Sequence, residues 1–150
     1  GSCMAATAER DGMSLVAVVL GCASTEDRFS SAASLLDAGF SGWALTAPSL
    51  SSDALAPIAV EKGMQSTVAV EADPLTGVVV PKGRAGEVVC ETTMEETLTA
   101  PVEQGQAVGE VTCVLDGEVL ARSQIRAASS VEALTFSSAW LSLLRAVVSF

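Results

Sequence analysis

The sequence predicts a mainly β chain with a helix near each end. Three observations lead to this prediction: short apolar runs separated by turn residues, a pair of strand-like runs around an Asp-Gly dipeptide, and two stretches of helical periodicity. We expect a β-hairpin and helix over residues 1–43, a linker over 44–56, a small β-sandwich domain over 57–128 and an amphipathic helix over 129–150.

The first strands are predicted as a β-hairpin. Two apolar-rich runs, Cys3–Thr7 and Met13–Leu20, flank Asp11 and Gly12, a dipeptide suited to a tight two-residue turn. The run from Leu15 to Leu20 is apolar on both faces, whereas a strand with one solvated face would alternate. We therefore expect this strand to need cover on both sides.

A helix is predicted after the hairpin. Ser24 and Asp27 fit an N-terminal capping pair, and apolar residues then recur at helical spacing up to Phe40, with Gly39 as the expected stop. This helix can cover one face of the hairpin, but no other nearby segment is suited to cover the second. Residues 1–43 are therefore expected to be the remnant of a larger domain.

The middle of the chain changes in pattern. Residues 44–56 are small and polar without a period, which is typical of a linker or a crossing segment. Short strands follow with turn signals every 8–12 residues, including Asp116-Gly117, which predicts a second hairpin. The candidate strands are Ile58–Lys62, Ser66–Glu71, Thr76–Pro81, Glu87–Thr93, Val108–Leu115 and Glu118–Ile125.

The last segment is predicted as an amphipathic helix on a membrane surface. Its apolar residues recur at i, i+4, i+7 and i+11, but the run is too short and too interrupted for a transmembrane span. The predicted membrane-contacting residues are Phe136, Trp140, Leu143, Leu144 and Val147. The alternative is a helix that packs on its own protein.

The charge and composition exclude several classes of function. The net charge is -10 with 8 basic residues, so nucleic-acid binding is not expected. The chain contains no His, which excludes Ser-His-Asp and Cys-His nucleophile schemes and the common zinc sites. We expect no metal and no cofactor. The first ten residues show no signal-peptide pattern.

The four cysteines are interpreted as free thiols. None of Cys3, Cys22, Cys90 and Cys113 sits in a C-x-x-C pair, so dithiol and metal chemistry are disfavoured. Cys3 and Cys22 should share a face of the hairpin at roughly 7–8 Å, too far for an unstrained disulfide. Buried thiols that pack as small hydrophobic side chains are the favoured interpretation.

Several strings in the chain resemble the D-alanyl-D-alanine carboxypeptidases, which are low-molecular-mass penicillin-binding proteins. Residues 1–13 and 15–21 are similar to the strand pair near the end of that family's catalytic domain, an α/β transpeptidase-like domain. Arg28, Leu35-Leu36-Asp37 and Gly39-Phe40 are similar to its last helix, and Ala100-Pro101-Val102 and Leu115-Asp116-Gly117 resemble its β-rich C-terminal domain. The helix with Trp140 lies where the family places its membrane anchor.

The resemblance implies a serine enzyme that removes the terminal D-alanine from peptidoglycan stem peptides, using S-x-x-K, S-x-N and K-T-G elements. None of these elements occurs here: neither Lys62 nor Lys82 follows a Ser by three positions, and the chain has no Asn. The family's catalytic elements would all precede Gly1. This chain alone is therefore expected to be non-catalytic and to serve as a stalk and anchor.

One family position does fall within the chain. An Arg at the start of the last helix contacts the substrate's terminal carboxylate, and Arg28 matches it. A cation in a helix's first turn opposes the helix dipole, so its placement needs a reason, and a bidentate carboxylate contact is one. The alternative is an Arg neutralised by Glu26 and Asp27 on a solvated surface.

The resemblance further implies the outer face of a bacterial cell membrane, within the cell envelope, with the peptidoglycan stem peptide as partner of the parent protein. A stand-alone envelope scaffold or interaction module is the alternative. A homo-oligomer formed through exposed strands is a third interpretation.

Overall fold

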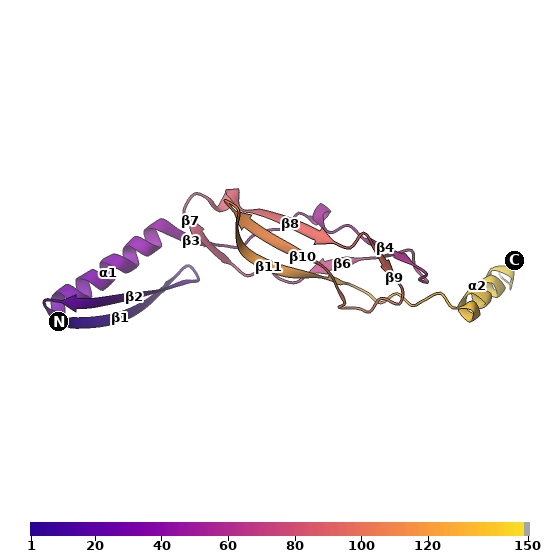
Figure 1. Cartoon of the computed structure of the whole chain (residues 1–150), viewed down its shortest axis with the longest axis horizontal. Helices are drawn as coiled ribbons and strands as arrows, with labels where there is room; N and C mark the ends of the chain where they lie inside the picture. Colours follow the sequence, from indigo (N-terminus) through magenta and orange to yellow (C-terminus); the bar gives the residue numbers. More distant parts are fainter. Residues whose placement is uncertain (149–150) are drawn as a thin grey trace. The chain divides into compact units, whose positions relative to one another are not determined.

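The computed structural model describes residues 1–148, which form two compact units (Figure 1). The first unit joins Gly1–Pro48 to Thr76–Val89, and the second joins Ser49–Leu75 to the residues from Cys90 onward. The first contains a hairpin, a helix and a two-stranded sheet, and the second contains a four-stranded and a three-stranded sheet and the last helix. This composition confirms the predicted mainly β fold class.

The predicted hairpin begins the first unit. β1 (Ser2–Arg10) pairs antiparallel with β2 (Met13–Cys22), and Asp11 and Gly12 connect them with φ values of 53° and 77°. Positive φ at both positions is what a type I′ turn requires, and its twist matches that of the strands. The pairing register shifts between Ser2 and Met4, which brings Ser2 opposite Cys22.

The helix α1 (Thr25–Gly42) begins as predicted but ends later. The backbone N–H of Asp27 donates to Ser24 Oγ at 3.0 Å, which confirms the cap. The predicted stop at Gly39 is wrong, because Gly39 lies within the helix and serves close packing instead. A Cβ added there would lie 2.6 Å from Leu15 Cδ1, so glycine lets α1 approach β2.

One face of the hairpin is covered and the other is bare. Ala32 and Phe40 of α1 are buried where the helix packs on β2. The opposite face of β2 exposes Val16, Val18 and Leu20, with exposed fractions of 68%, 59% and 74%. The prediction that nothing nearby covers the second face is therefore confirmed for the described residues.

The expected linker over 44–56 is partly wrong. β3 (Trp43–Thr46) follows α1 directly and pairs antiparallel with β7 (Val78–Pro81), which is more than 30 residues later in the chain. Val80 of β7 is buried. Sequence periodicity does not detect this strand, because four residues are too few to show a period and its partner is distant in the chain. Two short 3₁₀ turns, Ser52–Ala54 and Ala85–Glu87, lie in the connections.

The four-stranded sheet of the second unit has the strand order β6-β11-β10-β8 (Figure 1). Its strands are β6 (Val70–Ala72), β8 (Val89–Met94), β10 (Ala107–Leu115) and β11 (Glu118–Ala127). β10 and β11 form the predicted hairpin, with Asp116 and Gly117 at φ 53° and 82°. Val108, Val111 and Ile125 form the centre of its core, each 1% exposed or less.

The three-stranded sheet has the order β5-β4-β9. β4 (Ile58–Glu61) pairs antiparallel with β5 (Thr67–Val68) and parallel with β9 (Thr97–Thr99), a strand that the sequence pattern did not predict. The single strand predicted over 66–71 is interrupted at Ala69, whose carbonyl accepts from the backbone N–H of Ala128 at 2.8 Å. The chain thereby passes from the β4 sheet to the β11 sheet.

The interpretation of all four cysteines as buried free thiols is wrong. Cys90 of β8 and Cys113 of β10 form a disulfide between neighbouring strands. The pairing of β8 with β10 could not be read from spacing, because 23 residues separate the two cysteines. Cys3 and Cys22 are free, but neither is buried, and the shift in register places them in different environments, exposed and half-buried.

The predicted C-terminal helix is α2 (Phe136–Val148). Its start is capped by Thr135 and Ser138, where the backbone N–H of Thr135 donates to Ser138 Oγ at 2.9 Å. Within the described residues, α2 and α1 both fall short of the length and apolarity that a membrane-crossing helix needs.

Candidate functional site

Arg28 lies in the first turn of α1, as predicted, and is half-buried there. Its guanidinium carbon lies 5.3 Å from the centroid of the Phe29 ring, a cation–π contact. Its Nε is buried and has no hydrogen-bond partner among the described residues. The described structure shows no ion pair between Arg28 and either Glu26 or Asp27, so the alternative of local neutralisation gains no support.

A buried guanidinium nitrogen without a partner is costly, because desolvation is not compensated. Native proteins therefore rarely leave such a donor unpaired unless another group approaches it. The Nε of Arg28 is therefore a buried donor that the described structure leaves unsatisfied.

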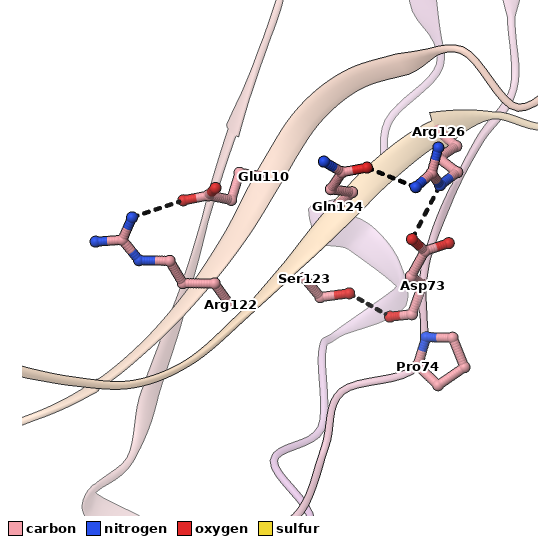
Figure 2. A pocket seen from close by; sticks show the side chains of 7 residues that line it. All are labelled: Asp73, Pro74, Glu110, Arg122, Ser123, Gln124 and Arg126. Carbon is pink, nitrogen blue, oxygen red and sulfur yellow. Dashed lines mark hydrogen bonds and ion pairs between the residues drawn. The ribbon is translucent and has the colours of Figure 1, made fainter.

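A polar hollow of about 570 Å³ lies on the second unit (Figure 2). β10 and β11 contribute most of its lining, and the turn that follows β6 completes it. The lining residues are Asp73, Pro74, Glu110, Arg122, Ser123, Gln124 and Arg126. Sequence reasoning did not single out any of them, because charged residues at alternate strand positions are typical of a solvated sheet face.

Arg126 holds one side of the hollow together. Its Nε donates to Asp73 Oδ2 at 2.9 Å, and its Nη2 donates to Gln124 (Figure 2). Its Nη1 donates to the carbonyl of Gly105 at 3.1 Å. Ser123 Oγ donates to the carbonyl of Asp73 at 2.6 Å. These bonds join the turns at residues 73 and 105 to β11, so Arg126 has a structural role.

The other side of the hollow is loosely held. Arg122 lies 3.7 Å from Glu110, and their side chains are 62% and 47% exposed. An ion pair so exposed contributes little to stability. The hydroxyl of Ser123 donates to a backbone carbonyl and no Lys lines the hollow, so the arrangement offers hydrogen bonding rather than serine nucleophile chemistry.

The predicted membrane-contacting residues of α2 are all exposed. Helical spacing places them on one face, opposite the side that carries Ser138, Ser142 and Arg145. The exposed fractions of Phe136, Trp140, Leu143, Leu144 and Val147 are 88%, 57%, 62%, 44% and 72%.

The opposite side of α2 faces its own unit. Ser138, Leu141, Ser142 and Arg145 line a cavity of about 210 Å³ together with Met64, which follows β4. The helix thus directs its more polar side toward the protein and leaves the apolar face uncovered in the described structure. A helix packed on its own protein would bury the apolar face instead.

The described residues contain no group of three or more His, Cys, Asp or Glu side chains arranged to hold a metal ion. The sequence did not indicate two structural features: the disulfide between Cys90 and Cys113, and the hydrogen-bond network around Arg126. An even number of cysteines was the only signal for the first.

The family model that matches this chain covers mainly the second unit. Residues 50–133 match the family described as penicillin-binding protein 5, C-terminal domain. The chain is 27% identical over 135 residues to the D-alanyl-D-alanine carboxypeptidase DacF of Bacillus subtilis, covering 89% of this chain and 35% of that protein. It is 29% identical over 130 residues to the D-alanyl-D-alanine carboxypeptidase DacC of Escherichia coli, covering 86% of this chain and 32% of that protein.

Two solved structures have a similar fold. Penicillin-binding protein 5 of Haemophilus influenzae superimposes with a TM-score of 0.66 at 25% identity, covering 87% of this chain and 38% of that one. A peptidoglycan synthesis regulatory factor (PBP3) of Streptococcus pneumoniae, at 22% identity and a TM-score of 0.63, has the same fold over 88% of this chain and 40% of its own. The chain spans about a third of the length of the curated relatives it matches.

These findings confirm the family resemblance inferred from the sequence. The matched range contains both sheets of the second unit, the disulfide and the polar hollow, and more than half of the chain. The chain therefore belongs to the family of the penicillin-binding protein 5 C-terminal domain.

Proposed function

We propose that this chain is the C-terminal portion of a D-alanyl-D-alanine carboxypeptidase that acts on peptidoglycan at the outer face of a bacterial cell membrane. In this proposal the first unit completes the catalytic domain, the second unit is a stalk, and α2 rests on the membrane. The chain itself carries no catalytic residue.

The bare face of the hairpin carries the proposal. Val16, Val18 and Leu20 expose a contiguous set of β-branched and aliphatic side chains on one side of β2. An exposed apolar surface of this kind marks an interface. The proposed occupant is the part of the parent protein that holds the serine nucleophile, and the same bare face disfavours a stand-alone scaffold module.

Arg28 is the residue we assign to the substrate. Its buried Nε lacks a partner, and its side chain lies beside Phe29 on the end of α1 where the chain enters from β2. In the parent protein the guanidinium would bind the terminal carboxylate of the stem peptide, or the equivalent carboxylate of a penicillin. A bidentate pair fixes the orientation of that carboxylate as well as binding it.

Two further features support the proposed location. A disulfide such as that between Cys90 and Cys113 persists in oxidising compartments and is rare in the cytosol. The uncovered apolar face of α2, with Trp140 among its members, fits a helix lying in a membrane interface.

The first test uses the native protein from source cells. Antibody raised against this chain should precipitate a protein much larger than 15.2 kDa that is labelled covalently by a fluorescent penicillin. An unlabelled protein of 15.2 kDa would contradict the carboxypeptidase assignment and favour the scaffold module. Light scattering on the purified chain then tests association through exposed strands.

The role of Arg28 is tested in the full-length protein. Arg28→Ala should lower the second-order rate of penicillin acylation by roughly 10- to 100-fold, because a charge-assisted pair is lost. Arg10→Ala is the matched control, because Arg10 also stacks on an aromatic ring, that of Phe40 at 4.6 Å. This substitution should leave the acylation rate unchanged. Equal acylation rates for wild type and Arg28→Ala would remove Arg28 from the binding site.

A further inference from the structure

The apolar face of α2 lacks the cations that membrane-surface helices commonly carry. Arg145 is the one ionisable residue of the helix, and it lies on the side that faces the cavity beside Met64. Basic residues on a surface helix attract anionic headgroups and strengthen binding. On α2, apolar burial alone would have to drive the binding.

The charges next to the helix offer no attraction either. The carbonyl of Lys62 accepts from the backbone N–H of Leu134 at 2.7 Å, and the carbonyl of Glu132 accepts from that of Met64 at 2.8 Å. These bonds hold one cation and one anion beside the segment that leads into α2. The two residues add no net charge at this place, and Arg145 is the one ionisable residue of α2 itself.

The rest of the second unit is strongly acidic. Residues 49–75 and 90–150 contain twelve acidic side chains against four basic ones. The acidic residues are Asp53, Glu61, Glu71, Asp73, Glu91, Glu95, Glu96, Glu103, Glu110, Asp116, Glu118 and Glu132. The sheets therefore carry a negative field toward any surface on which α2 lies.

We infer that α2 binds a bilayer surface of low net charge, and that anionic lipid weakens this binding rather than strengthening it. The inference rests on the membrane role proposed above and adds the kind of surface. At physiological ionic strength the screening length is about 8 Å, so acids on the sheets are largely screened. At about 0.01 M salt it reaches roughly 30 Å, so the whole unit is repelled by an anionic surface.

The experiment measures vesicle binding by the whole chain with Trp43→Phe, which leaves Trp140 as the single tryptophan of the sequence. Vesicles of phosphatidylcholine alone are compared with vesicles containing phosphatidylglycerol as well, at physiological and at low salt. A blue shift of Trp140 fluorescence reports insertion into the interface. Vesicle flotation gives the partition coefficient.

The expected result is a salt effect opposite to that of a basic anchor. Binding to phosphatidylcholine should hardly change with salt, whereas binding to the anionic vesicles should fall roughly fivefold at low salt, the effect of about one charge near the surface. The variant Glu91→Gln/Glu95→Gln/Glu118→Gln, which removes three exposed acids of the twelve, should make that fall smaller.

Several results would overturn the inference, each for a different reason. Tighter binding to anionic vesicles at low salt would overturn the lipid preference and leave the membrane role intact. Binding to neither vesicle would overturn the membrane role itself. A dimer in light scattering, with Trp140 already blue-shifted in the absence of lipid, would show that a second copy covers the apolar face.

A matched pair of variants checks which face of α2 is used. Leu143→Ser, on the uncovered apolar face, should weaken binding to both kinds of vesicle equally. Leu141→Ser lies on the cavity side and should have a much smaller effect. Equal losses for the two variants would contradict the assigned face.

Discussion

Removal of the disulfide between Cys90 and Cys113 should strongly destabilise the second unit. The two cysteines are 23 residues apart, so the bond closes a loop of that length in the unfolded chain. Loop-closure entropy for such a loop is about 3 kcal/mol at 25 °C. Small domains have a free energy of unfolding of about 5–15 kcal/mol, so this loss is a large fraction of the total.

The perturbation is made in two ways. Reduction of the wild-type chain breaks the bond without changing side-chain volume, whereas Cys90→Ala/Cys113→Ala also leaves space where Cys113 is fully buried. Urea unfolding followed by circular dichroism should show a lower midpoint in both cases, with a larger shift for the variant. Cys3→Ala/Cys22→Ala, which alters only the free cysteines, should shift the midpoint little.

Thiol alkylation provides the decisive readout. Denatured, unreduced protein purified from an oxidising compartment should react at two thiols, Cys3 and Cys22, and at four after reduction. Reaction at four thiols before reduction would refute the pairing. A midpoint that reduction leaves unchanged would refute the stabilising role even if the bond forms.

Three substitutions test other elements of the fold. Gly109→Ala should destabilise the protein by roughly 1–3 kcal/mol in urea unfolding, because the added Cβ would lie 2.5 Å from the carbonyl oxygen of Thr93. Gly86→Ala is the control, because a Cβ there would have no atom within 4 Å. Equal urea midpoints for the two variants would refute the close approach of β8 and β10. Ser24→Ala should cost about 1 kcal/mol by removing the cap of α1, measured by thermal unfolding, and an unchanged Tm would show that the cap is not formed. Arg126→Met should lower the free energy of unfolding by about 1–2 kcal/mol, a figure that allows for the partial exposure of Arg126. Arg122→Met should hardly change it, because the ion pair of Arg122 is exposed. Similar urea midpoints for the two variants would refute the structural role of Arg126.

The two units differ in how well they cover their own apolar residues, as the proposed parent protein would require. The second unit buries Val108, Val111 and Ile125 almost completely. The first unit leaves Val16 and Leu20 largely exposed on the face opposite α1. If the second unit is a stalk, it can bury its own core, whereas a strand pair taken from the interior of a larger domain would need the rest of that domain.

Local chemistry was sufficient to predict much of this chain. The turn at Asp11-Gly12, the cap at Ser24 and the turn at Asp116-Gly117 each depend on neighbouring residues only, and the structure shows all three. The bare face of the hairpin could also be predicted from the sequence, because a strand that is apolar on both faces needs a packing partner on each of them. The apolar face of α2 followed from its periodicity in the same way.

Tertiary structure alone decided the rest, because the partners are far apart in the chain. β3 exists because β7 returns to pair with it, and β9 exists because it lies parallel to β4. The sequence suggested a helix stop at Gly39, whereas the structure shows that Leu15 packs closely against it. The sequence also suggested free thiols at Cys90 and Cys113, which form a disulfide because β8 lies beside β10. Arg126 likewise gains its role only when folding brings Asp73 and Gly105 to β11. Sequence patterns indicate which surfaces are apolar enough to be buried, but contacts between segments distant in the chain decide which residues pack together.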